Sequence, residues 1–94
     1  MEVPKTPVRG RIDIIADILE SSVEATRKTT IMYRANLSFR QLQTYLPWLV
    51  ENGFLEAYLN QGVKIYIIDK KGNAFLEVYR LLNAVLGEKK TVKE

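Results

Sequence analysis

The chain has 94 residues, 47% hydrophobic and 27% charged, a composition typical of one folded domain rather than of a disordered tail. It contains no Cys and no His, which excludes disulfides, thiolate nucleophiles, imidazole bases and ordinary zinc sites. We therefore expect a protein that is not an enzyme and that uses no metal or cofactor. The formal net charge of +3 suits a nucleic-acid partner without requiring one.

No apolar run approaches the roughly 20 residues that a membrane-spanning helix needs. The N-terminus also lacks the apolar core of a signal peptide. Together these features predict a soluble cytoplasmic protein with no membrane partner.

The first ten residues have the composition of a flexible basic lead segment. Pro4, Pro7 and Gly10 stand among Lys5 and Arg9. This segment is able to touch phosphate, but the sequence gives it no fixed shape.

Residues 11–20 have the periodicity of a helix with apolar side chains on two faces. One face holds Ile12, Ile15, Ala16 and Leu19, and the nearly opposite face holds Ile14 and Ile18. One face can pack on the elements that follow, whereas the other needs a second partner, either the C-terminal helix or another subunit. Asp13, Asp17 and Glu20 lie on the same helix, but no second carboxylate cluster accompanies them, so we expect no metal site.

Residues 29–53 show the spacing of a helix-turn-helix. Two helical patterns, 31–35 and 39–52, are separated only by Asn36, Leu37 and Ser38. The segment before them, residues 21–27, breaks the helical pattern, and the sequence does not establish a strand there. The spacing makes nucleic-acid binding the leading hypothesis.

The second of these helices has a marked beginning and end. Ser38 and Gln41 form a capping-box pattern, so a helix begins at Phe39. Asn52-Gly53 permits the left-handed turn that ends it. Its inward face holds Leu42, Tyr45, Leu46, Leu49 and Val50, and its outward face holds Arg40, Thr44, Pro47, Trp48 and Glu51.

Charge is segregated over the same part of the chain. No Asp or Glu occurs from Ala25 to Val50, so this segment carries +4 from Arg27, Lys28, Arg34 and Arg40. Phosphate contacts need cations that neighbouring carboxylates do not neutralise, and the segregation therefore favours a nucleic-acid partner. The alternative is an ordinary solvated helix surface.

After Gly53 the apolar period shortens to about two, which predicts a β-hairpin, or wing, over residues 55–68. Gly62 fits the left-handed position of a three-residue loop at Asn60-Gln61-Gly62. Lys64 is the sole cation of the tip, so we expect a modest contribution of the wing to DNA affinity.

Asp69 can cap a last helix over residues 70–86. Two adjacent apolar stripes follow this helix, one of Ala74, Val78, Leu81 and Val85 and one of Phe75, Tyr79, Leu82 and Leu86. A lone surface helix needs about one stripe, so we interpret the second as a dimer seam rather than a wider intramolecular core. The predicted dimerisation residues are Phe75, Val78, Tyr79, Leu82, Val85 and Leu86.

Four segments, RIDIIADILE, TTIMYRANLS, YLPWLVENGFL and YIIDKKG, resemble the archaeal winged-helix family that includes the small basic ten-a DNA-binding proteins of crenarchaea. The resemblance covers about residues 11–86. It implies a mainly α fold with a small β-hairpin, and a homodimer joined by an antiparallel coiled coil of the last helices, with two heads set apart to engage duplex DNA. Two departures stand out, namely Asp69 in place of the usual threonine and Pro47 inside the recognition helix, where it predicts a kink or an early break.

The expected organisation is a lead at 1–10, a winged helix-turn-helix domain at 11–68 and a dimerisation helix with a basic tail at 69–94. In a major groove the N-terminal turns of the recognition helix lie closest to the bases, so Arg40 is the first choice for a guanine contact and Gln43 or Thr44 for adenine or phosphate. Arg27, Lys28 and Arg34 are more suited to phosphates, and Lys64 adds one cation from the wing. Trp48 is more suited to packing against the hairpin or last helix than to stacking on a base.

The preferred function is a double-stranded-DNA-binding homodimer that acts in transcription regulation or chromosome organisation, which places it with the nucleoid. The alternative is a winged helix that binds another protein through the same surface, because fold does not fix function. The acid-free charge favours DNA, whereas Pro47 and the weakly basic wing favour the alternative.

Overall fold

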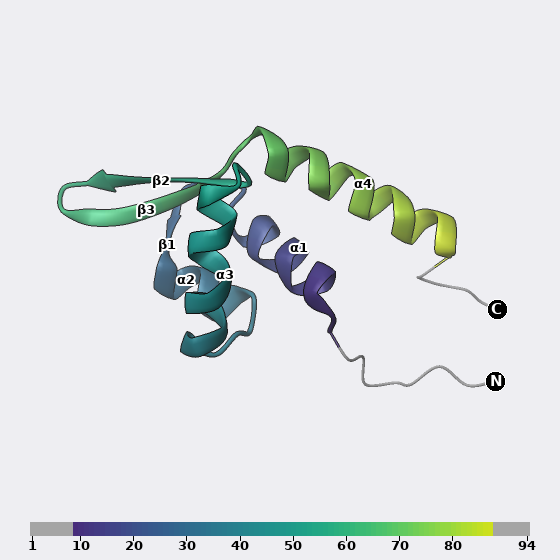
Figure 1. Cartoon of the computed structure of the whole chain (residues 1–94), viewed down its shortest axis with the longest axis horizontal. Coiled ribbons are helices and arrows are strands. Elements are labelled where there is room, and N and C mark those ends of the chain that lie inside the picture. Colours follow the sequence, from purple (N-terminus) through teal and green to yellow (C-terminus); the bar gives the residue numbers. More distant parts are fainter. Residues whose placement is uncertain (1–8, 88–94) are drawn as a thin grey trace.

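The computed structural model describes residues 9–87, and the predictions for a basic lead before residue 9 and a basic tail after residue 87 lie outside these residues. In chain order the elements are α1 (Arg11–Ser21), β1 (Thr26–Arg27), α2 (Lys28–Arg34), α3 (Phe39–Glu51), β2 (Leu55–Asn60), β3 (Val63–Ile68) and α4 (Lys70–Leu86). The β2–β3 hairpin projects to one side of the helical body, and α4 extends toward the other (Figure 1). The predicted fold class, a mainly helical winged helix-turn-helix with a long last helix, is confirmed.

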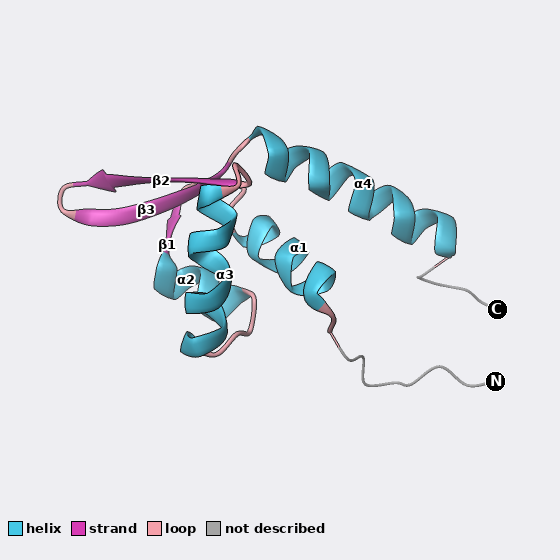
Figure 2. Ribbon diagram, in the orientation of Figure 1, coloured by secondary structure: helices cyan, strands magenta, loops and turns pink. Residues whose placement is uncertain are grey.

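Helix α1 lies at the centre of the molecule, between α2 and α4 (Figure 2). Both of its predicted apolar faces are buried, with Ile14, Ile15, Ala16, Ile18 and Leu19 all in the core. Its second packing partner is therefore α4 of the same chain. Ile12 is the exception, because it lies in the first helical turn, where nothing in the described part of the chain covers it and the side chain stays 57% exposed.

The sheet has three antiparallel strands in the order β1-β3-β2. Strand β1 pairs Thr26 with Tyr66. It is too short to show the apolar–polar alternation by which a strand is recognised in a sequence. The hairpin loop is shorter than predicted, because Asn60 pairs with Val63 and belongs to the strand. The two loop residues, Gln61 and Gly62, both have positive φ, of 53° and 81°, as a tight two-residue hairpin turn requires.

Helix α4 begins against the backbone of Phe54 and the end of β3. The Asp69 carboxylate accepts a hydrogen bond of 2.7 Å from the Lys70 amide, which confirms the predicted cap. Gly72 is buried in the first turn, where a Cβ atom would overlap the carbonyl oxygen of Phe54 and lie 2.7 Å from Cγ1 of Ile68. Only a residue without a side chain permits this approach, which explains the glycine of the KKG segment.

A row of aromatic rings joins the end of α3 to α4. Trp48 stacks on Phe54 with ring centroids 5.4 Å apart, Phe54 meets Phe75 edge-on at 6.0 Å, and Phe75 stacks on Tyr79 at 6.2 Å. Trp48 therefore packs on the residue just before the hairpin, and not on the hairpin or the last helix as expected. Such pairs stabilise beyond their burial by about 0.5 to 1.5 kcal/mol each.

Candidate nucleic-acid interface

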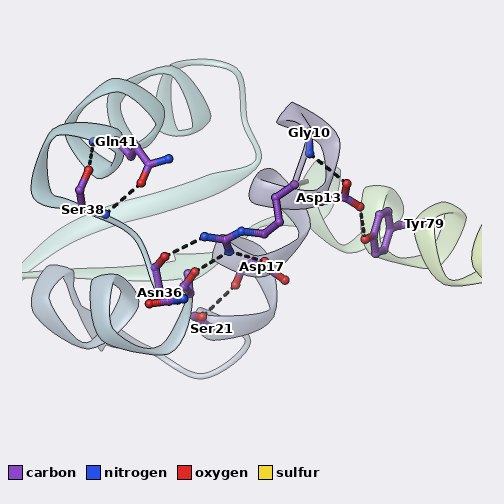
Figure 3. Close-up of polar contacts among 10 residues, drawn as sticks. Gly10, Asp13, Asp17, Ser21, Asn36, Ser38, Gln41 and Tyr79 are labelled. Carbon is purple, nitrogen blue, oxygen red and sulfur yellow. Dashed lines mark hydrogen bonds and ion pairs between the residues drawn. The ribbon is translucent and has the colours of Figure 1, made fainter. Parts of the chain in front are cut away.

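The turn between α2 and α3 is built as the sequence predicts. The Ser38 hydroxyl accepts from the Gln41 amide at 3.1 Å, and the Gln41 side chain accepts from the Ser38 amide at 3.0 Å (Figure 3). Asn36 adopts a left-handed conformation with φ of 54°, and Leu37 is buried. This turn fixes where the N-terminus of α3 points.

Arg9 holds this turn from the side of α1, a role that the sequence did not reveal. Its Nη1 atom donates to Oδ2 of Asp17 at 2.7 Å and to the carbonyl of Ala35 at 2.6 Å, and its Nη2 atom donates to the carbonyl of Asn36 at 2.7 Å. Arg9 and Gly10, which we expected in the flexible lead, are thus part of the folded domain. Three of the N–H donors of the guanidinium are therefore used within the fold.

Helix α3 continues through Pro47 and ends at Glu51, so the expected early break does not occur. The end is a Schellman motif, in which the amide of Phe54 donates to the carbonyl of Leu49 at 2.9 Å and the amide of Gly53 to that of Val50 at 3.2 Å. The inward residues Leu42, Leu46 and Leu49 are buried. The outward face is exposed, as predicted.

A groove of about 360 Å³ separates α3 from the wing and brings together three of the predicted DNA-binding residues, Lys28, Gln43 and Lys64. Pro47 and Glu51 also line it. Glu51 comes directly after the acid-free segment of the sequence, and its side chain lines the same groove as Lys28 and Lys64. The groove is therefore basic where it meets the wing and α2, and acidic at the C-terminal end of α3.

Arg34 and Arg40 flank the turn between α2 and α3, and both side chains are exposed. The Thr44 hydroxyl donates to the carbonyl of Arg40 at 3.1 Å. Because this bond uses the hydroxyl proton of Thr44, its oxygen can only accept a further hydrogen bond. Such an acceptor suits the amino group of a base, whereas a phosphate oxygen would need a donor.

Arg27 lies apart from the other predicted DNA-binding residues. It pairs with Ile65 across β1 and β3, whereas the neighbouring pair, Thr26 and Tyr66, faces the opposite side of the sheet. Tyr66 lines the groove beside α3, so Arg27 occupies the other face of the sheet.

Among residues 9–87, the cations of α2 and α3 form no ion pair with a carboxylate. Within residues 9–87 the ion pairs join Arg9 to Asp17 and Arg80 to Glu20, and neither involves this surface. The first turns of α2 and α3 also contain no acidic residue. A helix N-terminus carries about half a positive charge, so the beginning of α3 adds to the positive potential of Arg40.

Phe39 is a further part of this surface that sequence reasoning missed. The Nζ atom of Lys28 lies 5.1 Å from the centroid of its ring, a cation–π contact that orients the ammonium. The sequence does offer one signal for this role, namely an aromatic residue at the first position of the predicted helix. In the structure the Phe39 side chain is 54% exposed.

The predicted dimerisation residues divide into two groups. Phe75 and Tyr79 are half-buried against the core of their own chain. By contrast, the outer face of α4 exposes the other four, Val78, Leu82, Val85 and Leu86, by 49–73%. Leu81, which the prediction did not include, is exposed on the same face.

Polar contacts fix α4 against α1. The Tyr79 hydroxyl donates to Oδ1 of Asp13 at 2.6 Å, and the same carboxylate accepts from the amide of Gly10 through Oδ2 (Figure 3). The Asp13 carboxylate, together with partial burial, raises the pKa of Tyr79. At the other end of α1, Arg80 donates to Glu20 at 2.6 Å.

The described residues contain no group of acidic side chains that could hold a metal ion. Nor does any helix within residues 9–87 have the length and apolarity to cross a membrane.

A capped helix-turn-helix followed by a β-hairpin defines a winged helix-turn-helix domain. The chain belongs to the winged helix-turn-helix family, whose sequence profile matches residues 8–86. Among solved structures it is similar to Sso10a-2, a DNA-binding protein from Sulfolobus solfataricus, with 26% identity, a TM-score of 0.68, and coverage of 89% of this chain and all of that one. The resemblance seen in the sequence is thereby confirmed.

Two proteins of Methanocaldococcus jannaschii are also similar. Uncharacterized protein MJ0287 is 29% identical over 77 residues, which span 81% of this chain and 79% of that protein. Uncharacterized protein MJ0290 is 35% identical over 79 residues, which span 79% of this chain but only 36% of the longer relative.

Proposed function

We propose that this protein is a homodimer that binds double-stranded DNA, with α3 presented to the major groove. In the cell it acts with the nucleoid, as a transcription regulator or a chromosome-organising protein, and it has no catalytic role. The similarity to Sso10a-2, a DNA-binding protein, supports this assignment.

The observation that carries the proposal is the set of cations around α2, α3 and the wing that lack carboxylate partners among residues 9–87. A structural surface normally intersperses both signs of charge, and helix N-termini normally favour acidic residues. Here the first turns of α2 and α3 have cations in their place. A polyanion is the partner that removes this electrostatic cost.

We assign contacts to five of the predicted DNA-binding side chains. We propose that Arg40, in the first turn of α3, contacts guanine and that Gln43, one turn later, contacts adenine. Lys28 and Lys64 border the groove, where a phosphate strand can pass between α3 and the wing. Arg34 adds a phosphate contact beside the turn. Arg27 belongs to this set only if the duplex also meets the far face of the sheet.

Glu51 limits how deeply α3 enters the major groove of the duplex. Its carboxylate lines the C-terminal end of the basic surface and repels phosphates there. The duplex therefore meets the N-terminal half of α3, before Pro47. This geometry agrees with the major-groove docking of other recognition helices, whose first turns contact the bases.

The exposed apolar face of α4 supports the homodimer. Val78, Leu81, Leu82, Val85 and Leu86 follow one side of the helix and are solvent-exposed in the single chain. A second copy of α4 placed against this face buries both surfaces and separates two DNA-binding heads.

The second candidate is a protein-interaction module. It is favoured by the mixed character of the groove, where Leu46, Val50 and Pro47 lie beside Glu51. Such a lining suits a peptide with both apolar and basic side chains.

The proposal is tested by titrating a labelled random 30-base-pair duplex at low salt, with the single strand as control, and repeating the titration with Glu51→Gln. DNA binding predicts saturable duplex binding that strengthens when the groove carboxylate is neutralised. Glu77→Gln, on the exposed surface of α4, is the matched control and should strengthen binding less. Absence of duplex binding at low salt would make the protein-interaction module the better explanation.

A further inference from the structure

The tip of the wing carries an apolar side chain that the fold does not use. Leu59 is 70% exposed and lies directly opposite Lys64 on β3. Turns are normally polar, whereas this leucine lies at the tip, beside the cation of the wing. The other apolar residue of the tip, Val63, pairs with Asn60 and therefore faces the opposite side of the hairpin.

The register places Leu59 on the side of the wing that faces α3. Side chains alternate along a strand, so Leu59 shares a face with Ala57 of its own strand and with Lys64 and Tyr66 of β3. Ala57, Lys64 and Tyr66 line the groove against α3. A duplex that meets α3 is consequently on the same side as Leu59.

The wing is long enough to reach a neighbouring groove of that duplex. Strands of six residues at about 3.4 Å per residue extend about 20 Å. They project from the body as a separate arm (Figure 1). Half a helical turn of DNA is about 17 Å, the distance from a major groove to the next minor groove.

The chemistry of the tip fits a minor groove. That groove is only about 6 Å wide, so a two-stranded ribbon cannot lie flat in it, but a single side chain can enter. Lys64 on the same face and Gln61 in the turn place ammonium and amide groups near Leu59, the kinds of group that bind minor-groove acceptors. Residues 57–68 contain no Asp or Glu to repel the phosphates.

We propose that Leu59 acts as a wedge, which enters the minor groove beside the bound α3, partly unstacks one base step and bends the duplex. This inference rests on the proposed binding of duplex DNA and adds an architectural activity to it. Aliphatic wedges of this kind kink DNA by about 20 to 90°. Bending should be greatest at TA steps, which unstack most easily.

The test measures binding and bending on the same sample. A 30-base-pair duplex with a central TA step carries a donor and an acceptor dye at its two ends, so that anisotropy reports binding and energy transfer reports the end-to-end distance. The wild-type protein should raise energy transfer as it saturates the duplex. Leu59→Ala should bind the duplex with an affinity within about threefold of wild type, because the lost contact is offset by the base unstacking that is no longer required. It should, however, lose most of the increase in energy transfer.

Val63→Ala is the matched control, since it removes apolar atoms from the same tip on the opposite face and should bend DNA normally. Lys64→Ala should weaken binding and lower the salt dependence by about one phosphate, yet still bend a saturated duplex. Leu59→Gln repeats the test with a polar side chain of similar size.

The outcomes separate the wedge from the proposed function. Binding without any change in energy transfer would overturn the wedge and leave duplex binding intact. Equal bending by wild type, Leu59→Ala and Leu59→Gln would do the same. Failure to bind any duplex would overturn both.

Discussion

Substitution of Gly72 by alanine separates two opposing effects on the stability of this fold. Helix propensity alone favours alanine by up to about 1 kcal/mol. The structure predicts the opposite sign, because the added Cβ would overlap the carbonyl oxygen of Phe54 and lie 2.7 Å from Cγ1 of Ile68 and 3.1 Å from Cδ2 of Leu19. The balance between them depends on whether these neighbours can move.

The carbonyl of Phe54 has little freedom to move. It accepts a hydrogen bond of 2.9 Å from the amide of Asp69, and the amide of Phe54 donates to Leu49 in the motif that ends α3. Overpacking costs about 1 to 3 kcal/mol where side chains can adjust. Because the overlap here is with backbone, we expect Gly72→Ala to lose about 3 kcal/mol.

For a domain of this size, that loss corresponds to a Tm lower by about 12 to 24 °C. Thermal unfolding followed by circular dichroism at one fixed protein concentration measures it. Asn73→Ala, the next residue on the exposed side of α4, is the control and should change stability by less than about 1 kcal/mol. An unchanged or higher Tm for Gly72→Ala would refute the close seating of α4 against the wing.

Three further predictions address the interface, the dimer and the α1–α4 contact. Arg40→Ala should weaken duplex binding by about 1 to 3 kcal/mol in anisotropy titrations if Arg40 reads a base. Leu82→Glu should convert the proposed dimer to a monomer in sedimentation, since it buries a charge in the seam along α4. Tyr79→Phe should cost about 1 kcal/mol at pH 7, by loss of the hydrogen bond to Asp13. The folded state raises the pKa of Tyr79 above its ordinary value of 10.0, so this stabilisation is complete below pH 10 and is lost as the pH rises further.

Each of these has its own control. Arg80→Ala removes a cation that pairs with Glu20 instead and should bind DNA nearly normally; a loss equal to that of Arg40→Ala would indicate a nonspecific charge effect. Ala84→Glu adds the same charge to α4 outside the seam, and a persistent Leu82→Glu dimer would show that the seam is elsewhere. For Tyr79, urea unfolding at several pH values should show the difference from Phe shrinking above pH 10. A difference independent of pH would contradict the assigned cause.

The local elements could be predicted because each is encoded by neighbouring residues. The capping box of Ser38 and Gln41 and the cap at Asp69 use partners within three positions. The periodicity of α3 likewise separated its buried leucines from its exposed face. The hairpin was predicted too, but its loop length depends on the strand register, which sequence periodicity specifies only loosely.

Features that depend on distant contacts could not be predicted. Arg9 contacts the carbonyl of Asn36, 27 residues away, and nothing near Arg9 in the sequence marks that partner. Similarly, periodicity placed Glu51 on the outward face of α3, but it did not show that Glu51 lines the same groove as Lys28 and Lys64. Charge segregation along the chain therefore identified the basic surface without giving its boundary.

The most direct test of DNA binding is the salt dependence of the wild-type affinity for a random duplex. Lys28, Arg34 and Lys64 are the proposed phosphate ligands on the side of α3, and each neutralised phosphate contributes about −0.9 to the slope of log K against log salt. A dimer that engages both heads should therefore give a slope of about −5, whereas a slope near zero would contradict phosphate binding by this surface.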